Sequence, residues 1–265
     1  MLLCSVLRSL NNTKLIIGNK KGSIMNIFVC ETQEKMSESA AIMIAAQIIA
    51  KPNSVLGFAT GSTPLGTYQQ IIRMYNEGLV DFRTVQTFNL DEYIGLAVEN
   101  DQSYHYFMWK NLFSKVNVDK NKVSLPSGTA SDMEQECDSY ERRIDASGGI
   151  DIQLLGIGEN GHIGFNEPAD NFAQGTHCVQ LEESTIKSNA RFFEREEDVP
   201  KSAITMGIGT IMKAGKIILL ASGIKKAEIV KQMVYGAVTP QVPASILKFH
   251  KDVTVITDRE AGSLL

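Results

Sequence analysis

Short apolar runs alternate with amphipathic segments along most of this chain. Residues 32–50 place Met36, Ala40, Met43 and Ile44 on one helical face, and a Pro-Asn pair ends the pattern. The same spacing rules predict further helices over 65–75, 104–112, 134–144 and 225–235, and strands over 26–30, 55–59, 85–90, 150–157, 217–222 and 253–257. Strands that alternate with helices are typical of an α/β fold, so we expect one domain on an open, doubly wound, mostly parallel, Rossmann-like sheet.

Residues 1–24 lie before this pattern and differ from it. They contain basic residues but no acidic one, and neither a basic leader nor a small-residue cleavage site flanks their apolar start. These features argue against a secretory signal. We predict that residues 25–265 form the domain, that Met25 is the physiological start and that residues 1–24 are an extension outside the fold. An ordinary N-terminal arm is the alternative.

Composition narrows the possible partners and the compartment. The chain has 265 residues, 43% of them hydrophobic, and a net charge of -4, which disfavours nucleic-acid binding because phosphate neutralisation needs clustered basic residues. The longest apolar run, 40–50, is interrupted by Gln47, so we expect no membrane span. The four cysteines are far apart and form no CxxC pair. This spacing argues against a zinc ribbon or a disulfide framework and favours the cytoplasm.

Three polar segments, 60–64, 91–95 and 156–167, follow predicted strands. In open α/β sheets the ligand binds outside the carboxyl ends of the strands. Loops that are distant in the chain can therefore converge on one crevice there.

The first segment, Thr60-Gly61-Ser62-Thr63, stands between a strand and a helix. Glycine allows close approach to an anion, and hydroxyls and helix N-terminal N–H groups can donate to it, so the loop suits a phosphate. A hydroxyl-rich helix cap is the alternative. The GxxxxGK[ST] motif is absent, which disfavours nucleotide hydrolysis.

The second segment carries the adjacent acids Asp91 and Glu92 at a strand end. A carboxylate there could serve as a general base or bind a metal, and a solvated loop is equally compatible with the spacing. Adjacent side chains point in different directions, so we predict that at most one faces the site.

The third segment surrounds His162 with glycines and places Asn160 and Glu167 nearby. Histidine titrates near neutrality and suits proton transfer, and a neighbouring carboxylate or amide can fix its tautomer. A surface histidine is the alternative. The segment contains GxGxxG, but no helical pattern follows it, so a dinucleotide site is disfavoured.

Five strings in order carry a resemblance to a known family. They are GFATGSTP (57–64), TFNLDEY (87–93), LGIGENGHIGFNEP (155–168), SNARFF (188–193) and AITMGIGT (203–210). Together they resemble the glucosamine-6-phosphate deaminase family, and the resemblance runs from about Met25 to the C-terminus. It implies an open α/β fold and conversion of glucosamine 6-phosphate and water to fructose 6-phosphate and ammonia, with no metal and no cofactor.

The resemblance also implies roles for individual residues. Asp91 would move a proton from C2 to C1, and His162 would catalyse ring opening with Glu167 and Asn160. The substrate phosphate would be bound by Thr60, Gly61, Ser62, Thr63, Arg191 and Lys226. Many family members carry Asp at the position of Asn160. Asp would raise the pKa of the histidine by charge, whereas Asn can only hydrogen-bond or shape the turn.

The same resemblance bears on regulation. Allosteric, hexameric members are activated by N-acetylglucosamine 6-phosphate at a second site with two basic residues, and His177 and Val179 occupy the matching positions here. Valine cannot bind phosphate, and histidine is only partly charged near neutral pH. We therefore predict a non-allosteric enzyme that is a monomer or a weakly associated homo-oligomer.

Three other functions compete with this interpretation. A sugar-phosphate sensor on the same fold would need a DNA-binding helix-turn-helix, and residues 1–60 show none. A 6-phosphogluconolactonase should need no enolising base, so Asp91 and the Asn-Glu-Pro string favour the deaminase. A galactosamine-6-phosphate deaminase is the nearest rival, and the sequence does not separate the two epimers.

Overall fold

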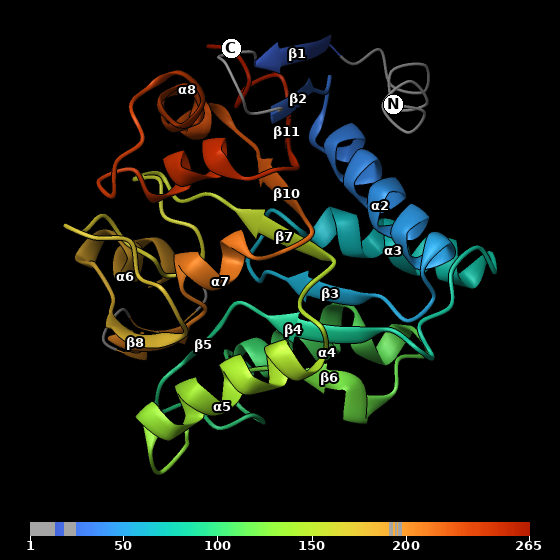
Figure 1. Cartoon of the computed structure of the whole chain (residues 1–265), viewed down its shortest axis with the longest axis vertical. Coiled ribbons are helices and arrows are strands. Elements are labelled where there is room, and N and C mark those ends of the chain that lie inside the picture. The colour runs from blue at the N-terminus through green and yellow to red at the C-terminus, as the bar shows by residue number, and fades with distance from the viewer. Residues whose placement is uncertain (1–13, 19–24, 191–192, 194, 196–197) are drawn as a thin grey trace.

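The computed structural model describes residues 14–18, 25–190, 193, 195 and 198–265, and these form a central sheet with helices on both faces (Figure 1). The strands of this sheet are β1 (Lys14–Gly18), β2 (Met25–Val29), β3 (Val55–Phe58), β4 (Gln86–Asn89), β6 (Val123–Ser124), β7 (Ile152–Gly156), β10 (Lys216–Ala221) and β11 (Val253–Thr257). Their order is β1-β2-β11-β10-β7-β3-β4-β6. All neighbouring pairs are parallel except β1 with β2, which confirms the predicted mostly parallel sheet.

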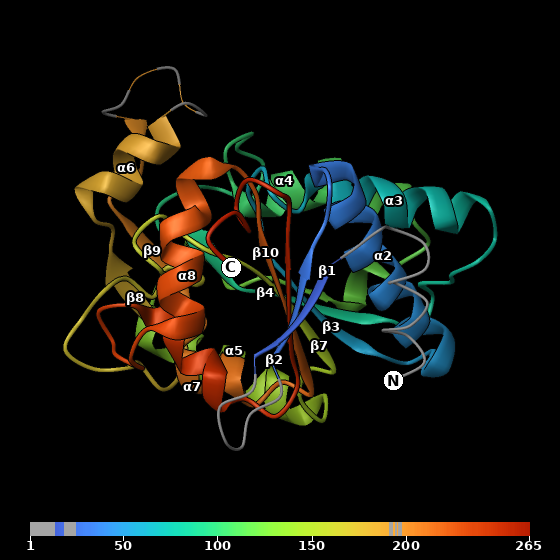
Figure 2. The same ribbon diagram turned by 90° about the horizontal axis from the view of Figure 1, so that it is seen from above.

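Helices cover the sheet in two layers. One layer contains α2 (Gln33–Ala50), α3 (Leu65–Asn76) and α4 (Tyr104–Asn111), and the other contains α5 (Met133–Ala146), α7 (Ile208–Met212) and α8 (Ala227–Tyr235). Figure 2 shows the sheet between these layers. Short 3-10 turns lie at η1 (Phe113–Lys115), η2 (Lys120–Lys122), η5 (Ile224–Lys226) and η6 (Pro243–Phe249). The architecture is therefore the doubly wound one that the alternating pattern predicts.

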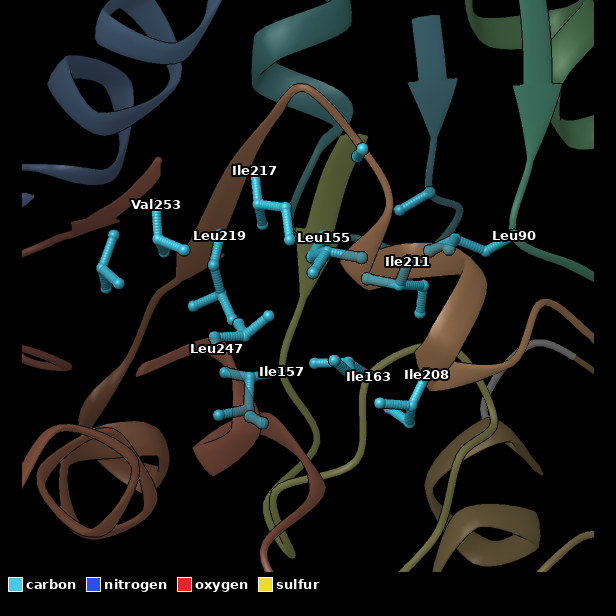
Figure 3. Close-up of a cluster of buried hydrophobic side chains, with 14 of the residues drawn as sticks. Leu90, Leu155, Ile157, Ile163, Ile208, Ile211, Ile217, Leu219, Leu247 and Val253 are labelled. Atoms are coloured by element: carbon cyan, nitrogen blue, oxygen red, sulfur yellow. The ribbon is translucent and has the colours of Figure 1, made fainter. Parts of the chain in front are cut away.

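Each face of the sheet has its own apolar core because side chains alternate along a strand. In β10, Ile218 and Leu220 pack into the core beneath α2 and α3, whereas Ile217 and Leu219 pack into the opposite core. Figure 3 shows part of this second core, where Ile217 and Leu219 lie with Leu155. Fully burying one such side chain stabilises the fold by about 1.5–3 kcal/mol, so these cores fix where the strands end.

Three helices begin at residues that cap their first N–H groups. The side chain of Thr32 accepts from Lys35 N at the start of α2, and that of Ser103 accepts from Tyr106 N at the start of α4. Asp132 does the same for α5. Such caps stabilise a helix by about 0.5–2 kcal/mol and explain where these helices begin.

A second sheet, which the sequence pattern does not predict, stands beside the large one. It consists of β5 (Asp91–Tyr93), β9 (Ser202–Thr205) and β8 (His177–Gln180), antiparallel in the order β5-β9-β8. The helix α6 (Glu183–Asn189) follows β8. These strands have three or four residues, which is too short for a period-2 pattern to stand out.

The strand order contains one topological switch point. From β3 the chain continues outward through β4 to β6, and from the adjacent β7 it continues the other way through β10 to β11. Loops that follow β3 and β7 therefore diverge, and open α/β sheets bind their ligands at such a switch point. The strand β4 lies next to β3 and the strand β10 lies next to β7, so the carboxyl ends of all four strands lie along the same edge of the sheet.

The N-terminal region contributes one strand to the sheet edge. Lys14 to Gly18 pair antiparallel with Val29 to Met25, so part of the stretch that we assign to an extension lies against β2. The domain at residues 25–265 stays a prediction. Within the described part of the chain, no helix is long and apolar enough to cross a membrane.

Candidate active site

The three polar segments and the turn that carries Lys226 follow the carboxyl ends of four adjacent strands. The segment with Lys226 follows β10, the segment with His162 follows β7, the loop 60–63 follows β3, and Asp91 follows β4. The switch point between β3 and β7 lies in the middle of this group. The topology thus brings together segments that are separated by more than half the length of the chain.

The turn that carries His162 is built on glycine. Gly158 N donates to His162 O at 2.9 Å, Gly161 N donates to Gly158 O at 3.1 Å, and Gly161 has φ +92. A Cβ on Gly158 would lie 2.3 Å from His162 Cε1, so only glycine leaves room for the imidazole. On either side of the turn, Ile157 and Ile163 anchor it in the apolar core (Figure 3).

His162 is paired with a buried carboxylate. Its Nδ1 lies 3.1 Å from Oε2 of Glu167, whose side chain is 6% exposed. The Nδ2 amide of Asn160 donates to the same oxygen at 2.6 Å, and the Thr185 hydroxyl donates to Oε1 at 2.5 Å. Both oxygens of Glu167 are therefore hydrogen-bonded, and the histidine ring is held by its Nδ1 side.

These contacts decide the charge of Glu167. Burial by itself would raise its pKa, but the hydrogen bonds and charge of His162 and the donors Thr185 and Asn160 outweigh burial and lower it. Glu167 is then a carboxylate at neutral pH and accepts the Nδ1 proton. With Nδ1 committed, Nε2 is the nitrogen available for chemistry.

Asn160 contacts Glu167 and the turn rather than the imidazole ring. Its Oδ1 accepts from His162 N at 3.2 Å while its Nδ2 donates to Glu167. One amide side chain thus shapes the backbone before the histidine and fixes the carboxylate behind it.

Asp91 is a buried carboxyl beside the histidine loop. It is 6% exposed, and burial, with a smaller contribution from the charge of Glu92, raises its pKa to about 8. A Cβ on Gly164, two residues after His162, would lie 3.7 Å from Asp91 Oδ2, which is ordinary contact, and only 2.9 Å from Thr205 Oγ1, so the histidine loop passes close to both residues. A carboxyl with a pKa this high has the basicity for abstracting a proton from carbon.

Glu92 faces away from this site. Its carboxylate accepts the backbone N–H groups of Tyr93 and Tyr104 on Oε1 and of His105 on Oε2, at 2.8 to 2.9 Å. It therefore binds the N-terminus of α4, where a negative charge is favourable. The prediction that at most one of the two acids faces the site is confirmed.

A set of hydrogen bonds joins the histidine loop to the small sheet. Phe165 N donates to Thr205 Oγ1 at 3.0 Å, and the Asn166 amide donates to Met206 O at 2.9 Å. Thr205 is the register partner of Asp91. We refer to these contacts between residues 163–166 and 205–206 as the inter-sheet joint. The joint sets the position of Asp91 relative to His162.

The loop 60–63 presents hydroxyls and glycine at the end of β3. Gly61 has φ +94 and open space where a Cβ would be. Helix α3 starts after Pro64, whose side chain offers no capping bond, and its first backbone N–H bonded inside the helix is that of Tyr68. The loop thus has the shape of an anion site.

Lys226 ends the short turn after β10. Gly223, with φ +87, starts this turn, and Asp258 fixes it by accepting from Gly223 N at 2.9 Å and from Ala261 N at 2.8 Å. Lys226 is half-buried at the start of α8. The expected phosphate ligand Arg191 lies outside the described residues.

Sequence reasoning missed Thr185 and Thr205. Each is buried and contacts the histidine loop from the small sheet or its helix. Thr205 lies in the string 203–210, which carries the resemblance but no role for this residue, and Thr185 lies in none of the five strings. Their roles depend on the small sheet, which the sequence pattern does not predict. In the described residues, no group of three or more His, Cys, Asp or Glu side chains could hold a metal ion.

Comparisons with known proteins bear on this site. The family model described as glucosamine-6-phosphate isomerases/6-phosphogluconolactonase matches residues 30–256. A glucosamine-6-phosphate deaminase of Clostridioides difficile (strain 630) is 58% identical over 241 residues, which cover 91% of this chain and 97% of the relative. A solved structure of a monomeric glucosamine-6-phosphate deaminase superposes with a TM-score of 0.88 at 47% identity and covers 90% of this chain and 99% of its own. A 6-phosphogluconolactonase from Trypanosoma cruzi shares the fold, with a TM-score of 0.72 at 21% identity over 90% of this chain and 96% of its own.

Proposed function

The chain belongs to the family of glucosamine-6-phosphate isomerases and 6-phosphogluconolactonases, and on that premise we propose that Asp91 and the His162–Glu167 pair carry out its reaction. The reaction is the conversion of glucosamine 6-phosphate and water to fructose 6-phosphate and ammonia. The observation that carries the assignment of roles is the buried Asp91 beside Gly164 of the loop that carries His162, whose Nδ1 is held by a carboxylate.

The His162–Glu167 pair suits ring opening. The step removes a proton from the C1 hydroxyl and delivers one to the ring oxygen, which breaks the bond between C1 and that oxygen. With Nδ1 held by Glu167 at 3.1 Å, Nε2 of a neutral His162 can accept the first proton and then give it to the ring oxygen. The charge of Glu167 stabilises the imidazolium between the two transfers.

Asp91 suits the isomerisation that follows. As a carboxylate it removes the proton from C2 of the open chain while the ammonium group loses a proton and the C1 carbonyl oxygen gains one, which gives a cis-enolamine. The protonated Asp91 then returns its proton to C1. The product is an imine at C2, to which water adds before ammonia leaves. One carboxylate can serve both carbons because they are adjacent.

The raised pKa of Asp91 has a consequence for binding. Because the pKa of Asp91 is about 8 in the empty site, only a minor fraction of this carboxyl group is ionised at neutral pH. A substrate ammonium group would favour the ionised form through its opposite charge. Binding of the amino sugar thus generates the base that the next step needs.

We assign the substrate phosphate to Thr60, Gly61, Ser62 and Thr63, with Lys226 and Arg191 as its cationic ligands. Gly61 and the start of α3 provide a donor-rich concave loop, and Lys226 stands at the end of a neighbouring strand. A phosphate dianion is favoured by both the helix N-terminus and the ammonium group.

The same proposal extends to assembly and location. We propose a monomer, because a structure with a TM-score of 0.88 is that of a monomeric enzyme, and a place in the cytoplasm, which the cysteine spacing favours. Sedimentation of the purified chain at several concentrations tests the first point. A hexamer at low micromolar concentration would contradict it.

An ammonia-release assay tests the function. We expect release from glucosamine 6-phosphate, coupled to fructose 6-phosphate formation, and no hydrolysis of 6-phosphogluconolactone. Activity on the lactone without ammonia release from the amino sugar would contradict the proposal. The same assay with galactosamine 6-phosphate measures how strongly the site discriminates between the two configurations at C4.

A further inference from the structure

Thr185 lies on α6 and contacts the proposed catalytic pair from outside the histidine loop. It is 5% exposed, and its hydroxyl donates to Glu167 Oε1 at 2.5 Å. The two residues are 18 positions apart in sequence, and Thr185 belongs to a different element from Glu167. The contact therefore couples α6 to the carboxylate that holds His162.

The two oxygens of Glu167 have different partners. Oε2 receives the Asn160 amide at 2.6 Å and lies 3.1 Å from His162 Nδ1. Among the described residues, the Thr185 hydroxyl is the donor with a recorded hydrogen bond to Oε1. Loss of that hydroxyl would leave a charged oxygen buried and unpaired, which is unfavourable.

This division of partners fixes the rotation of the carboxyl group. The last torsion of a glutamate side chain is broad and roughly two-fold, so one bonded oxygen leaves the group free to tilt. Donors on both oxygens determine the plane in which Oε2 meets the imidazole. Thr185 supplies the donor that the histidine loop itself does not supply.

The position of α6 is in turn set by packing beside Asp91. Leu181, just before α6, and Ile186, within it, belong to an apolar cluster with Tyr93 of β5 and Phe165 of the histidine loop. The Thr185 hydroxyl is therefore delivered to Glu167 by an element that rests on the small sheet.

We propose that Thr185 is a positioning residue for ring opening: its hydroxyl holds the Glu167 carboxylate in the orientation that binds His162 Nδ1. This inference rests on the proposed function, because it assigns Thr185 to a step of that reaction. Thr185 acts through Glu167 and does not itself exchange a proton with the sugar.

The test uses the full chain with two substitutions. Thr185→Val keeps the shape and removes the hydroxyl, and Thr185→Ser keeps the hydroxyl and removes a methyl group. We expect Thr185→Val to lower kcat about 10- to 100-fold, because a hydrogen bond to a charged group is lost. KM for glucosamine 6-phosphate should change less than about twofold, and Thr185→Ser should keep kcat within about threefold of wild type.

The titration of the Glu167 carboxyl group separates positioning from packing. His162 is the titratable side chain that contacts Glu167, whereas Thr185 and Asn160 are neutral. Without the Thr185 donor the pKa of Glu167 should rise, so the carbon-13 NMR signal of its carboxyl group should titrate at higher pH in Thr185→Val and not in Thr185→Ser. Melting temperatures of both variants control for folding, and Thr185→Ala replaces Thr185→Val if the valine variant does not fold.

The outcomes are distinct. Wild-type kcat and an unchanged titration of the Glu167 carboxyl group in Thr185→Val would overturn the inference. Equal losses of kcat in the valine and serine variants without a shift of that titration would also overturn it, because they indicate packing alone. Failure of the wild-type chain to release ammonia would instead overturn the proposed function.

Discussion

Replacing Asp91 with asparagine should make the protein inactive and, above about pH 5, more stable. Burial, with a smaller contribution from the charge of Glu92, raises the pKa of Asp91 to about 8, whereas an aspartate in an unfolded chain titrates near about 3.9. The folded state thus holds this proton more tightly than the unfolded state. Between those two pKa values, stability falls as pH rises, and Asp91 is the cause.

The magnitude follows from that interval. Each pH unit inside it changes the free energy of unfolding by about 1.4 kcal/mol, so wild type should lose about 3–4 kcal/mol through Asp91 between about pH 5 and about pH 8. Because the asparagine in Asp91→Asn does not titrate, this variant should lose none of that free energy of unfolding. Because Asp91 is only 6% exposed, solvent screening reduces this figure little.

Urea unfolding of both proteins across this pH range measures the effect, and ammonia release measures the activity. Subtracting the two stability curves cancels every other titrating group and the fixed difference between an amide and a neutral carboxyl. The difference should widen steadily in favour of Asp91→Asn while turnover is abolished. A difference that stays constant with pH would show that the pKa of Asp91 is not raised, and turnover within a few-fold of wild type would exclude it as the base.

Three further predictions concern the rest of the site. Gly158→Ala should displace the imidazole, because its Cβ would lie 2.3 Å from His162 Cε1, and lower kcat about 100-fold or more; an unchanged rate of ammonia release would refute this steric argument. Lys226→Ala should raise KM with little change in kcat, since phosphate is bound in ground and transition states alike, and a loss of kcat alone would count against phosphate binding. Because His177 and Val179 replace two basic residues, rate curves should be hyperbolic with or without N-acetylglucosamine 6-phosphate, and a sigmoidal curve that this compound makes hyperbolic would restore the allosteric alternative.

The large sheet could be predicted because its signals are local. Residues 32–50 show a helical face and become α2, and the apolar runs at 55–59 and 253–257 become β3 and β11 within a residue. Each of these elements is buried in or against the large sheet, so the order of apolar and polar residues along it directly reflects which positions are buried. The position of the site followed, since parallel strands end at one edge.

The small sheet and its contacts could not be predicted in this way. In the strand from His177 to Gln180, half-buried and exposed positions alternate. The strand has only four residues, which is too short for this alternation to stand out as a period in the sequence. The bond from Thr185 to Glu167 joins residues that only the folded small sheet brings together. The roles of Glu92 and Asn160 were likewise open, because a side chain's partners depend on where α4 begins and where Glu167 lies.

The inter-sheet joint gives the enzyme two catalytic halves on separate supports. His162 and Glu167 extend from the large sheet, whereas Asp91 belongs to the small one, and hydrogen bonds from Phe165 and Asn166 to residues 205–206 connect them. In the proposed mechanism, ring opening uses His162 and Glu167 of the first support, with Thr185 contacting Glu167 from α6, and proton transfer between carbons depends on the alignment of both supports. Loosening the joint should therefore impair isomerisation more than ring opening. In that mechanism the joint is the part of the molecule that couples the two partial reactions into one catalytic cycle.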